Sequence, residues 1–261
     1  MDFLSEIENQ LFDACENGRV EEIKQLLDNN PQININCENQ IGATLFYIAC
    51  YNGYAEIVEL LLNNERVETN KADTMNQPPF LKACFRGHLN VVKLLLNNER
   101  IDVNQVDSDG MTAFWLACRL GHVEIIKLLL NEEKIDVNKA NEDGETPLWI
   151  ACCYGYIEVV KCMLASGRVD LNVKNNEGES ELDIAREGKE EQEKYPAIVK
   201  FLEKNYSGIV ELLESFEKNP IETRMKLRIQ LGFAGKSIFL FIACFFFHLK
   251  YFSFTILILL F

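Results

Sequence analysis

Apolar positions recur with one fixed period over about the first 200 residues. The dipeptide Ala-Cys occurs at 14–15, 49–50, 83–84, 117–118 and 151–152, so its spacings are 35, 34, 34 and 34 residues. A Gly stands four residues after each Ala, and an apolar block of helical spacing follows, as in VEIIKLLL. Self-similarity at this period indicates a repeat architecture.

Each repeat predicts two short helices joined by a Gly. The segment TAFWLACRLG at 112–121 carries apolar side chains at helical spacing, after a hydroxyl residue suited to an N-cap. Gly121 permits the positive φ of a helix end, and residues 123–130 predict the second helix. A polar link with a left-handed turn residue connects the units; the equivalent positions are Gly42, Asn76, Gly110, Gly144 and Gly178.

A single unit of this size cannot bury its own apolar face, so neighbouring units must stack into a solenoid. The sequence therefore predicts an all-α fold of about six helix-turn-helix units. We expect them at roughly residues 6–39, 40–73, 74–107, 108–141, 142–175 and 176–205.

One segment carries a family motif. Residues 146–151 read Thr-Pro-Leu-Trp-Ile-Ala, against Thr-Pro-Leu-His-x-Ala in ankyrin repeats, and Gly87-His88, Gly121-His122 and the Asp-Val-Asn of 102–104 and 136–138 also match. Over about residues 9–205 the chain resembles the ankyrin-repeat family. The resemblance implies short β-turn or hairpin tips and a non-enzymatic protein-interaction scaffold or adaptor.

The chain departs from the family pattern in two ways. The motif His is replaced by Tyr47, Leu81, Trp115, Trp149 and Asp183, which predicts apolar packing where the family has a hydrogen bond. In the sixth unit, 13 residues separate Ala185 from Ile198, against 8 between Ala49 and Ile57. We expect the charged stretch REGKEEQEKYP to form a longer inter-helix loop in a polar C-terminal cap.

Beyond residue 205 the period stops. Residues 208–219 are apolar at helical spacing, and 219–232 begin with Asn219, Pro220 and Glu222, a capping-box pattern. Residues 206–236 therefore predict a helical hairpin or spacer.

Residues 237–261 form a hydrophobic tail in which 20 of 25 residues are apolar or aromatic. About 20 such residues span a bilayer as a helix, and basic residues just upstream mark the cytoplasmic side. Three interpretations stay open: a transmembrane anchor, translation of AT-rich non-coding DNA, or a packed soluble helix.

Composition indicates which class of partner and which cellular compartment to expect. The chain has 26 Lys and Arg against 40 Asp and Glu, a net charge of −14, which argues against nucleic acid as a partner. The first residues, MDFLSEIENQ, lack the pattern of a signal peptide, so we expect the nine Cys to belong to a protein of a reducing compartment. We expect a cytoplasmic protein, or one held at a membrane by its tail with the repeats facing the cytoplasm.

The chain shows no motif for a nucleophile, a phosphate loop or a metal. We expect the repeated Cys to be small buried residues, and Cys153 to lie beside the predicted binding groove. We expect His88 and His122 to make structural hydrogen bonds to the backbone between helices. We expect no enzyme activity, no cofactor and no metal.

The candidate binding site follows from the resemblance, which implies recognition on a concave face formed by the turn tips and the exposed side of each first helix. At the tips this gives Met75, Gln77, Asp109, Met111, Asp143 and Glu145. On the helices it gives Tyr51, Asn52, Phe85, Arg86, Arg119, Leu120, Cys153 and Tyr154. We expect a monomeric repeat domain that binds another protein, with the acidic tips favouring a basic one. A membrane-tethered adaptor and a regulatory or inhibitory enzyme subunit are the alternatives.

Overall fold

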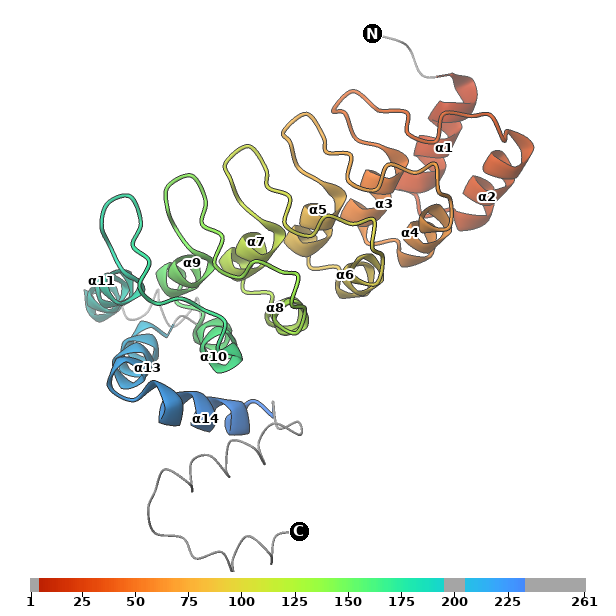
Figure 1. The fold of residues 1–261 in the computed structure, drawn as a ribbon. Coiled ribbons are helices and arrows are strands. Elements are labelled where there is room, and N and C mark those ends of the chain that lie inside the picture. The colour runs from red at the N-terminus through yellow and green to blue at the C-terminus, as the bar shows by residue number, and fades with distance from the viewer. Residues whose placement is uncertain (1–4, 195–204, 233–261) are drawn as a thin grey trace, which may run out of the picture.

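The computed structural model describes residues 5–194 and 205–232. Within these ranges the chain forms thirteen helices and no strand. Figure 1 shows them as a row of stacked helix pairs whose connecting tips all project from the same side. The all-α solenoid predicted from the period is confirmed.

The helices lie in two layers (Figure 1). The first helices of the units are α1 (Glu6–Glu16), α3 (Leu45–Asn52), α5 (Pro79–Arg86), α7 (Ala113–Leu120), α9 (Pro147–Cys153) and α11 (Glu181–Lys194). The second helices are α2 (Val20–Asn29), α4 (Ala55–Leu62), α6 (Leu89–Leu96), α8 (Val123–Leu130) and α10 (Ile157–Ser166). Each packs on its neighbours in both layers, so no unit stands alone.

Side-chain caps start the first helices where the sequence predicts them. The hydroxyl oxygens of Thr44, Thr112 and Thr146 each accept a hydrogen bond of 3.0–3.2 Å from the backbone N–H three residues later. Pro79 and Pro147 occupy the first helical position, where no N–H is needed. These caps fix the beginning of α3, α5, α7 and α9.

The residue after the inter-helix Gly links each unit to the one before it. The ring Nε2 of His88 lies 2.8 Å from the Tyr51 carbonyl oxygen, and Nε2 of His122 lies 3.1 Å from that of Phe85. Gly53 has φ +80°, and a Cβ there would lie 2.5 Å from Nδ1 of His88. The structural role predicted for both His residues is confirmed, and it requires Gly at position 53.

The repeated Ala-Cys dipeptide forms the centre of the core. The five Cys of this position (15, 50, 84, 118 and 152) are all 0% exposed. Burial raises the pKa of the Cys15 thiol to about 12, and it also raises the pKa of Cys84. Buried, protonated thiols are inert packing groups.

A row of Asn side chains links the loops that follow the second helices of neighbouring units. The Asn70 amide donates to the Arg100 carbonyl oxygen at 2.6 Å and accepts from the Asp102 N–H at 2.8 Å. Asn36, Asn104 and Asn138 make the same two bonds to the following unit. Both hydrogen-bonding groups of each amide are thus used between units, which fixes the stacking register.

Basic side chains cap the C-termini of the second helices from the following unit. Arg100 donates to the Leu62 carbonyl oxygen at 2.7 Å, Lys134 to Leu96 at 2.8 Å, and Arg168 to Leu130 at 2.9 Å. A cation at a helix C-terminus satisfies free carbonyls and opposes the helix dipole. These contacts add a polar link to the apolar stacking.

The prediction of a long loop in the sixth unit is wrong for residues 186–194. Helix α11 continues to Lys194, so most of the charged stretch is helical. The reason is its composition, since Glu, Lys, Gln and Arg are good helix formers. The extra residues lengthen the first helix by about two turns over its counterparts.

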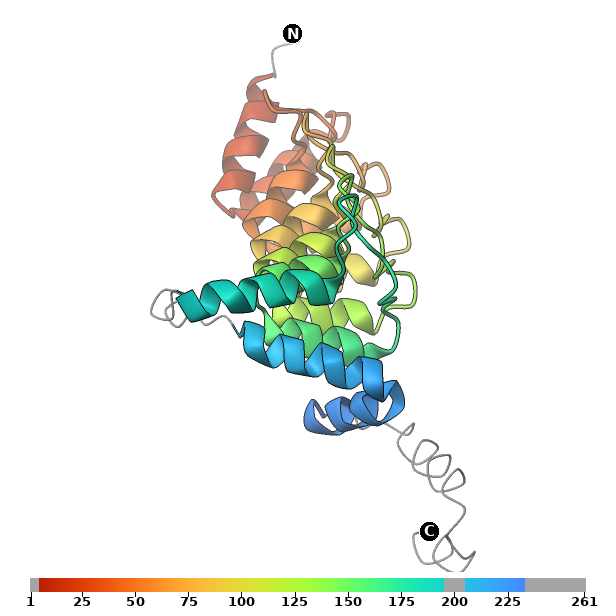
Figure 2. The ribbon, with the colours of Figure 1, turned by 90° about the vertical axis from the view of Figure 1, so that its left-hand side faces the viewer.

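Helix α13 (Tyr206–Lys218) occupies the place of the second helix of the sixth unit. The Tyr206 hydroxyl donates to the Cys153 carbonyl oxygen of the preceding unit at 2.8 Å. His88 of the third unit makes the equivalent bond to the Tyr51 carbonyl oxygen of the second. It packs on α11 and α10, and Figure 2 shows it directly beneath α11 at the end of the array. On these contacts we assign α13 to the sixth unit, which moves its end from residue 205 to 218.

Helix α14 (Pro220–Gln230) closes the described array. It packs against α10 and α13, with Asn219 accepting from the Glu222 N–H at its start, as the capping pattern predicts. No helix among the described residues is long and apolar enough to cross a membrane. The tail at 237–261 lies outside the described residues, so its three interpretations stay open.

Candidate functional site

Hydrogen bonds within each turn tip hold its backbone in one conformation. The Asp107 carboxylate accepts from the N–H groups of Asp109 and Met111 at 3.1 and 2.9 Å, and the Asp107 N–H donates to the Met111 carbonyl at 3.1 Å. Asn39, Asp73, Asn141 and Asn175 form the same tip in the other units. Each tip is hairpin-like without a strand, which presents its outermost side chains on a fixed backbone.

Neighbouring tips also bond to one another. The Thr74 N–H donates to the Ile41 carbonyl oxygen at 3.0 Å, and the Glu142 backbone N–H donates to the Asp109 carbonyl oxygen at 3.1 Å. The Asn176 N–H donates to Asp143 at 2.9 Å. Between the tips of units three and four the Asn76 side-chain amide donates to the Val106 carbonyl oxygen at 3.1 Å, so the tips form a continuous wall along one side of the first helices.

A groove of about 540 Å³ lies between this wall and the first helices of units four and five. Its lining comprises Asp109, Met111, Trp115, Arg119, Asn141, Glu142, Asp143, Glu145, Trp149, Ile150, Cys153 and Tyr154. Seven of the fourteen predicted site residues are among them. The structure thus brings together the predicted tip and helix positions of two adjacent units.

The floor of the groove pairs an aromatic ring with a cation. The Arg119 guanidinium lies 5.8 Å from the Trp115 ring centre, and the Trp115 Nε1–H donates to the Glu145 carbonyl oxygen at 2.9 Å. Burial raises the pKa of the Glu145 carboxyl, while a hydrogen bond from Asn141 and the charge of Arg119 oppose the change. The groove is therefore acidic, with one half-buried cation at its base.

Two of the bulky residues at the motif His position keep a polar link to the next unit. The Tyr47 hydroxyl donates to the Asp73 carboxylate at 2.7 Å, and Trp115 bonds to Glu145 as described. The expectation of purely apolar packing is wrong at these two positions. Phenol and indole are long enough to reach the following tip, where they help to hold the groove wall.

A second group of predicted residues gathers at units two and three. The Arg86 guanidinium lies 4.8 Å from the Tyr51 ring centre, and the Lys82 Nζ lies 6.0 Å from that centre and 5.4 Å from that of Phe85. We call Tyr51, Lys82, Phe85 and Arg86 the cation–aromatic cluster. It lies on the same face as the groove, on α3 and α5.

The remaining predicted residues lie on this face as single positions. Met75 is 61% exposed and Leu120 is 38% exposed, whereas Asn52 and Gln77 are half-buried. Tyr154, which lines the groove, is half-buried, and its ring stacks on Tyr156 with centres 6.0 Å apart.

Sequence reasoning missed several lining residues. Trp115, Asn141, Glu142, Trp149 and Ile150 line the groove without having been singled out as binding positions. Two of them stand at the motif His position, so the change from His to Trp was an available signal. Lys82 was also missed, although it stands one helical turn before Phe85 on the same helix face.

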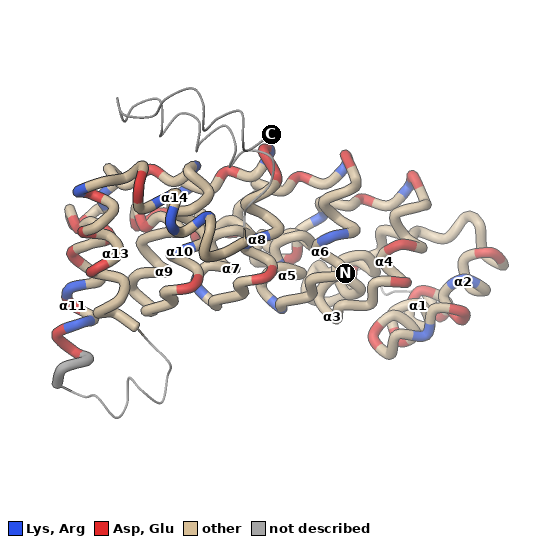
Figure 3. Tube along the Cα trace, turned by 90° about the horizontal axis from the view of Figure 1, so that it is seen from below, with Lys and Arg blue, Asp and Glu red and all other residues tan. Residues whose placement is uncertain are grey.

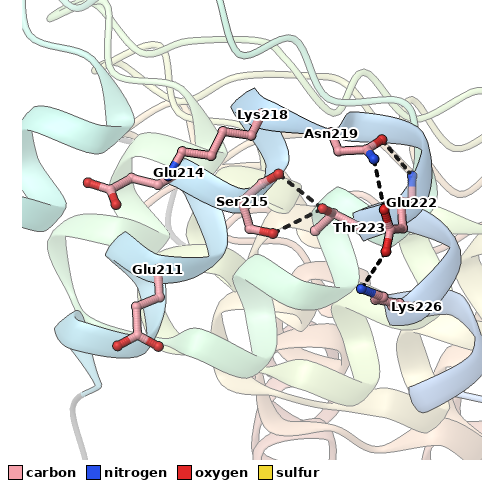
Figure 4. A pocket seen from close by; sticks show the side chains of 8 residues that line it. All are labelled: Glu211, Glu214, Ser215, Lys218, Asn219, Glu222, Thr223 and Lys226. Atoms are coloured by element: carbon pink, nitrogen blue, oxygen red, sulfur yellow. Dashed lines mark hydrogen bonds and ion pairs between the residues drawn. The ribbon is translucent and has the colours of Figure 1, made fainter.

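A smaller hollow of about 370 Å³ lies between α13 and α14 (Figure 4). Its polar side chains bond to each other: the Thr223 hydroxyl donates to the Ser215 carbonyl oxygen at 3.1 Å, and Lys226 pairs with Glu222 at 2.6 Å. Asn219 donates to the same Glu222 carboxylate at 2.8 Å. These bonds tie the hairpin together, which is a structural role.

Acidic positions are spread along the whole array (Figure 3). No group of His, Cys, Asp or Glu in the described ranges is arranged to hold a metal ion. The exposed Asp109, Glu142 and Asp143 give the tips of units four and five a negative charge on the concave face.

Comparison with known proteins agrees with this geometry. A family model described as "Ankyrin repeats (3 copies)" matches residues 11–107, 82–175 and 133–211. A crystal structure of EF0377, an ankyrin repeat protein, superposes with a TM-score of 0.67 at 23% identity, covering 81% of this chain and 98% of that one. No curated protein matches the sequence. The chain belongs to the ankyrin-repeat family, whose repeats are generally protein–protein interaction modules.

Proposed function

We propose that this protein is a non-enzymatic adaptor that binds a partner protein on its concave face. The observation that carries the proposal is the groove of units four and five, where seven residues predicted from repeat positions line one hollow of about 540 Å³. Its shape comes from hydrogen-bonded tips and capped helices, so it is largely formed before binding. A preformed surface loses little conformational entropy when a partner docks.

The side chains of this face support the same function. Tyr51, Arg86, Arg119 and Tyr154 belong to the residue types enriched at binding hot spots. Their rings and guanidinium groups are held against neighbours, at 4.8 Å for Arg86 on Tyr51 and 5.8 Å for Arg119 on Trp115. Held side chains again lower the entropic cost of an interface.

The alternative functions stay predictions. A membrane-tethered adaptor depends on residues 237–261, which lie outside the described ranges. The choice between a cytoplasmic location and one at a membrane depends on the same residues. A regulatory or inhibitory enzyme subunit would use the same concave face against an enzyme. The proposal of an adaptor needs neither feature.

A triple variant tests the proposal. Tyr51, Phe85 and Tyr154 are replaced by Ala in the full chain, and partners co-purifying with wild type and variant are compared by quantitative mass spectrometry. A matched control replaces the exposed Glu59, Lys93 and Glu124 on α4, α6 and α8. Both variants are first shown to keep the helical circular dichroism of the wild type. We expect the first to lose partners and the control to retain them; equal retention by both contradicts the proposal.

A further inference from the structure

The concave face changes chemistry along the array at one repeat position. The residue before the left-handed turn residue of each tip is Ile41, Met75, Asp109, Asp143 and Glu177 in units two to six. Ile41 and Met75 are 55% and 61% exposed, so two large apolar side chains face solvent where the later units carry carboxylates. The Thr74 N–H bond to the Ile41 carbonyl oxygen joins these two tips, so this end of the face has an apolar character that the later units lack.

A second repeat position singles out the same end of the array. Lys82 on α5 stands where units two, four, five and six have Ile48, Leu116, Ile150 and Ile184, and where the first unit has Asp13. It lies between the rings of Tyr51 and Phe85, and burial lowers the pKa of its ammonium group. Packing favours an aliphatic residue here, as in every neighbouring unit. A cation at this position has a cost that folding alone does not explain.

No carboxylate in the described part of the chain forms an ion pair with the cations of this cluster, although the charges of Asp73 and Asp107 act on Lys82 and oppose the lowering of its pKa. The ion pairs found there involve neither Lys82 nor Arg86. Both are held by rings, which leaves their N–H groups to bond with an incoming carboxylate. The exposed side chain of Asp109 one unit further on, and those of Glu142 and Asp143 two units further on, present the opposite charge.

Resting on the proposed function, we infer that the partner is an extended protein segment of dipolar chemistry. Its acidic end, a carboxylate beside an apolar side chain, meets Lys82 and Arg86 and the tips Ile41 and Met75. Its basic end, Lys or Arg, meets the acidic tips of units four and five. A purely basic partner brings no carboxylate to pair with Lys82 and Arg86, which is why both ends are required.

The spacing of the array sets the spacing of the charges. Packed helices lie about 10 Å apart, so two units separate the cluster from the tips of unit five by roughly 20 Å. An extended chain advances about 3.3 Å per residue. The carboxylate of the partner and the basic residue that meets the tip of unit five are therefore about six residues apart.

Peptide display provides the probe. The immobilised full chain selects from a library of random 16-residue peptides, and the enriched peptides are sequenced and synthesised. We expect a carboxylate next to an apolar residue, with Lys or Arg about six positions away in either chain direction. A peptide of the same composition with its charges interspersed is the control and should bind about tenfold more weakly.

A double-mutant cycle then tests the contact itself. Removing the carboxylate of a selected peptide (Asp→Asn or Glu→Gln) should weaken binding to wild type about tenfold, but leave binding to a Lys82→Met/Arg86→Met variant almost unchanged. Methionine is similar in size and polarity to the aliphatic residues at this position in units two, four, five and six, so we expect the Lys82→Met chain to fold. Lys93→Met on the outer face is the matched control and should behave as wild type.

The outcomes separate the two proposals. Peptides that lose binding to the Tyr51/Phe85/Tyr154→Ala variant, yet show no charge order and no coupling to Lys82 and Arg86, overturn the dipolar inference and leave concave-face binding intact. Peptides that bind this triple variant as tightly as wild type contradict the proposed function as well. Peptides that show the charge order and coupling to Lys82 and Arg86, and that lose binding to the triple variant, support both.

Discussion

The Thr146 hydroxyl donates a 3.3 Å hydrogen bond to the Glu181 carboxylate across the joint between the fifth and sixth units. Glu181 is 2% exposed and stands where the earlier units have Pro79, Ala113 and Pro147. Burial raises the pKa of this carboxyl from 4.5 to about 7, against the hydrogen bonds that it accepts. A single buried acid therefore makes the C-terminal joint sensitive to pH.

We predict that Glu181→Gln removes a pH dependence of stability between pH 4.5 and 7. In that window the folded carboxyl holds a proton that the unfolded chain has lost, so its contribution is present at low pH and is lost as the pH rises through 7. The variant should gain about 3 kcal/mol over wild type between pH 4 and 8. Urea denaturation across this range measures the difference.

The exposed Glu187 on the same helix provides the matched control. Glu187→Gln should leave the pH profile parallel to that of wild type. A Glu181→Gln profile that is also parallel would show that the buried carboxyl does not hold a proton in this window.

A second prediction concerns the assignment of α13 to the sixth unit. Tyr206→Phe removes only the hydroxyl that bonds to the Cys153 carbonyl oxygen at 2.8 Å. We expect a loss of about 1 kcal/mol, the usual net value of such a bond. Hydrogen exchange should show faster exchange of α13 amides and unchanged exchange in α6, because stacked units open locally. Unchanged protection of α13 contradicts the assignment.

The two Trp residues offer a matched comparison. The Trp115 Nε1–H donates to the Glu145 carbonyl oxygen at 2.9 Å, whereas the buried Nε1 of Trp149 has no hydrogen-bond partner among the described residues. Replacing either with Phe removes similar volume, but only Trp115→Phe also removes a hydrogen bond. We expect Trp115→Phe to be more destabilising by about 1 kcal/mol in urea denaturation. Equal losses would mean that the Trp115 bond makes no net contribution.

A fourth prediction tests the stacking register. Ala117 is 0% exposed at the centre of α7, so Ala117→Leu must overpack the contact between first helices. The expected loss is about 1–3 kcal/mol, and it should broaden unfolding of the central units because neighbours stabilise each other. Ser108→Leu at an exposed tip is the control. A midpoint of thermal unfolding that Ala117→Leu leaves unchanged contradicts the register.

Much of the fold follows from the sequence because each unit repeats the same physical solution. Thr at the N-cap, Gly at the helix end and Ala-Cys at the closest approach all fall where the structure uses them. The sixth unit was misread because an insertion separates its helices. From Ala185 to Ile209 the spacing is 24 residues, whereas it is 8 from Ala49 to Ile57. Similarity of YSGIVELL to YAEIVELL was the missed signal.

The candidate site was only partly predictable. Repeat positions identify which side chains face the groove, such as Asp143 and Tyr154, because each unit has the same backbone. They do not show which units line a groove, since that depends on side-chain size at positions such as Trp115 and Trp149. Lys82 was overlooked because helical periodicity assigns its position to the apolar side.

Site-specific photocross-linking tests the concave-face account most directly. A benzophenone amino acid is placed at Leu120 or Phe85 on the concave face, and at Lys93 or Glu59 on the outer helices, in the full chain expressed in cells. The account predicts partner adducts from positions 85 and 120 that disappear when Tyr51 and Tyr154 are also replaced by Ala, with none from 59 and 93. Adducts that arise from 59 and 93 alone would contradict it and move the binding surface to the outer helices.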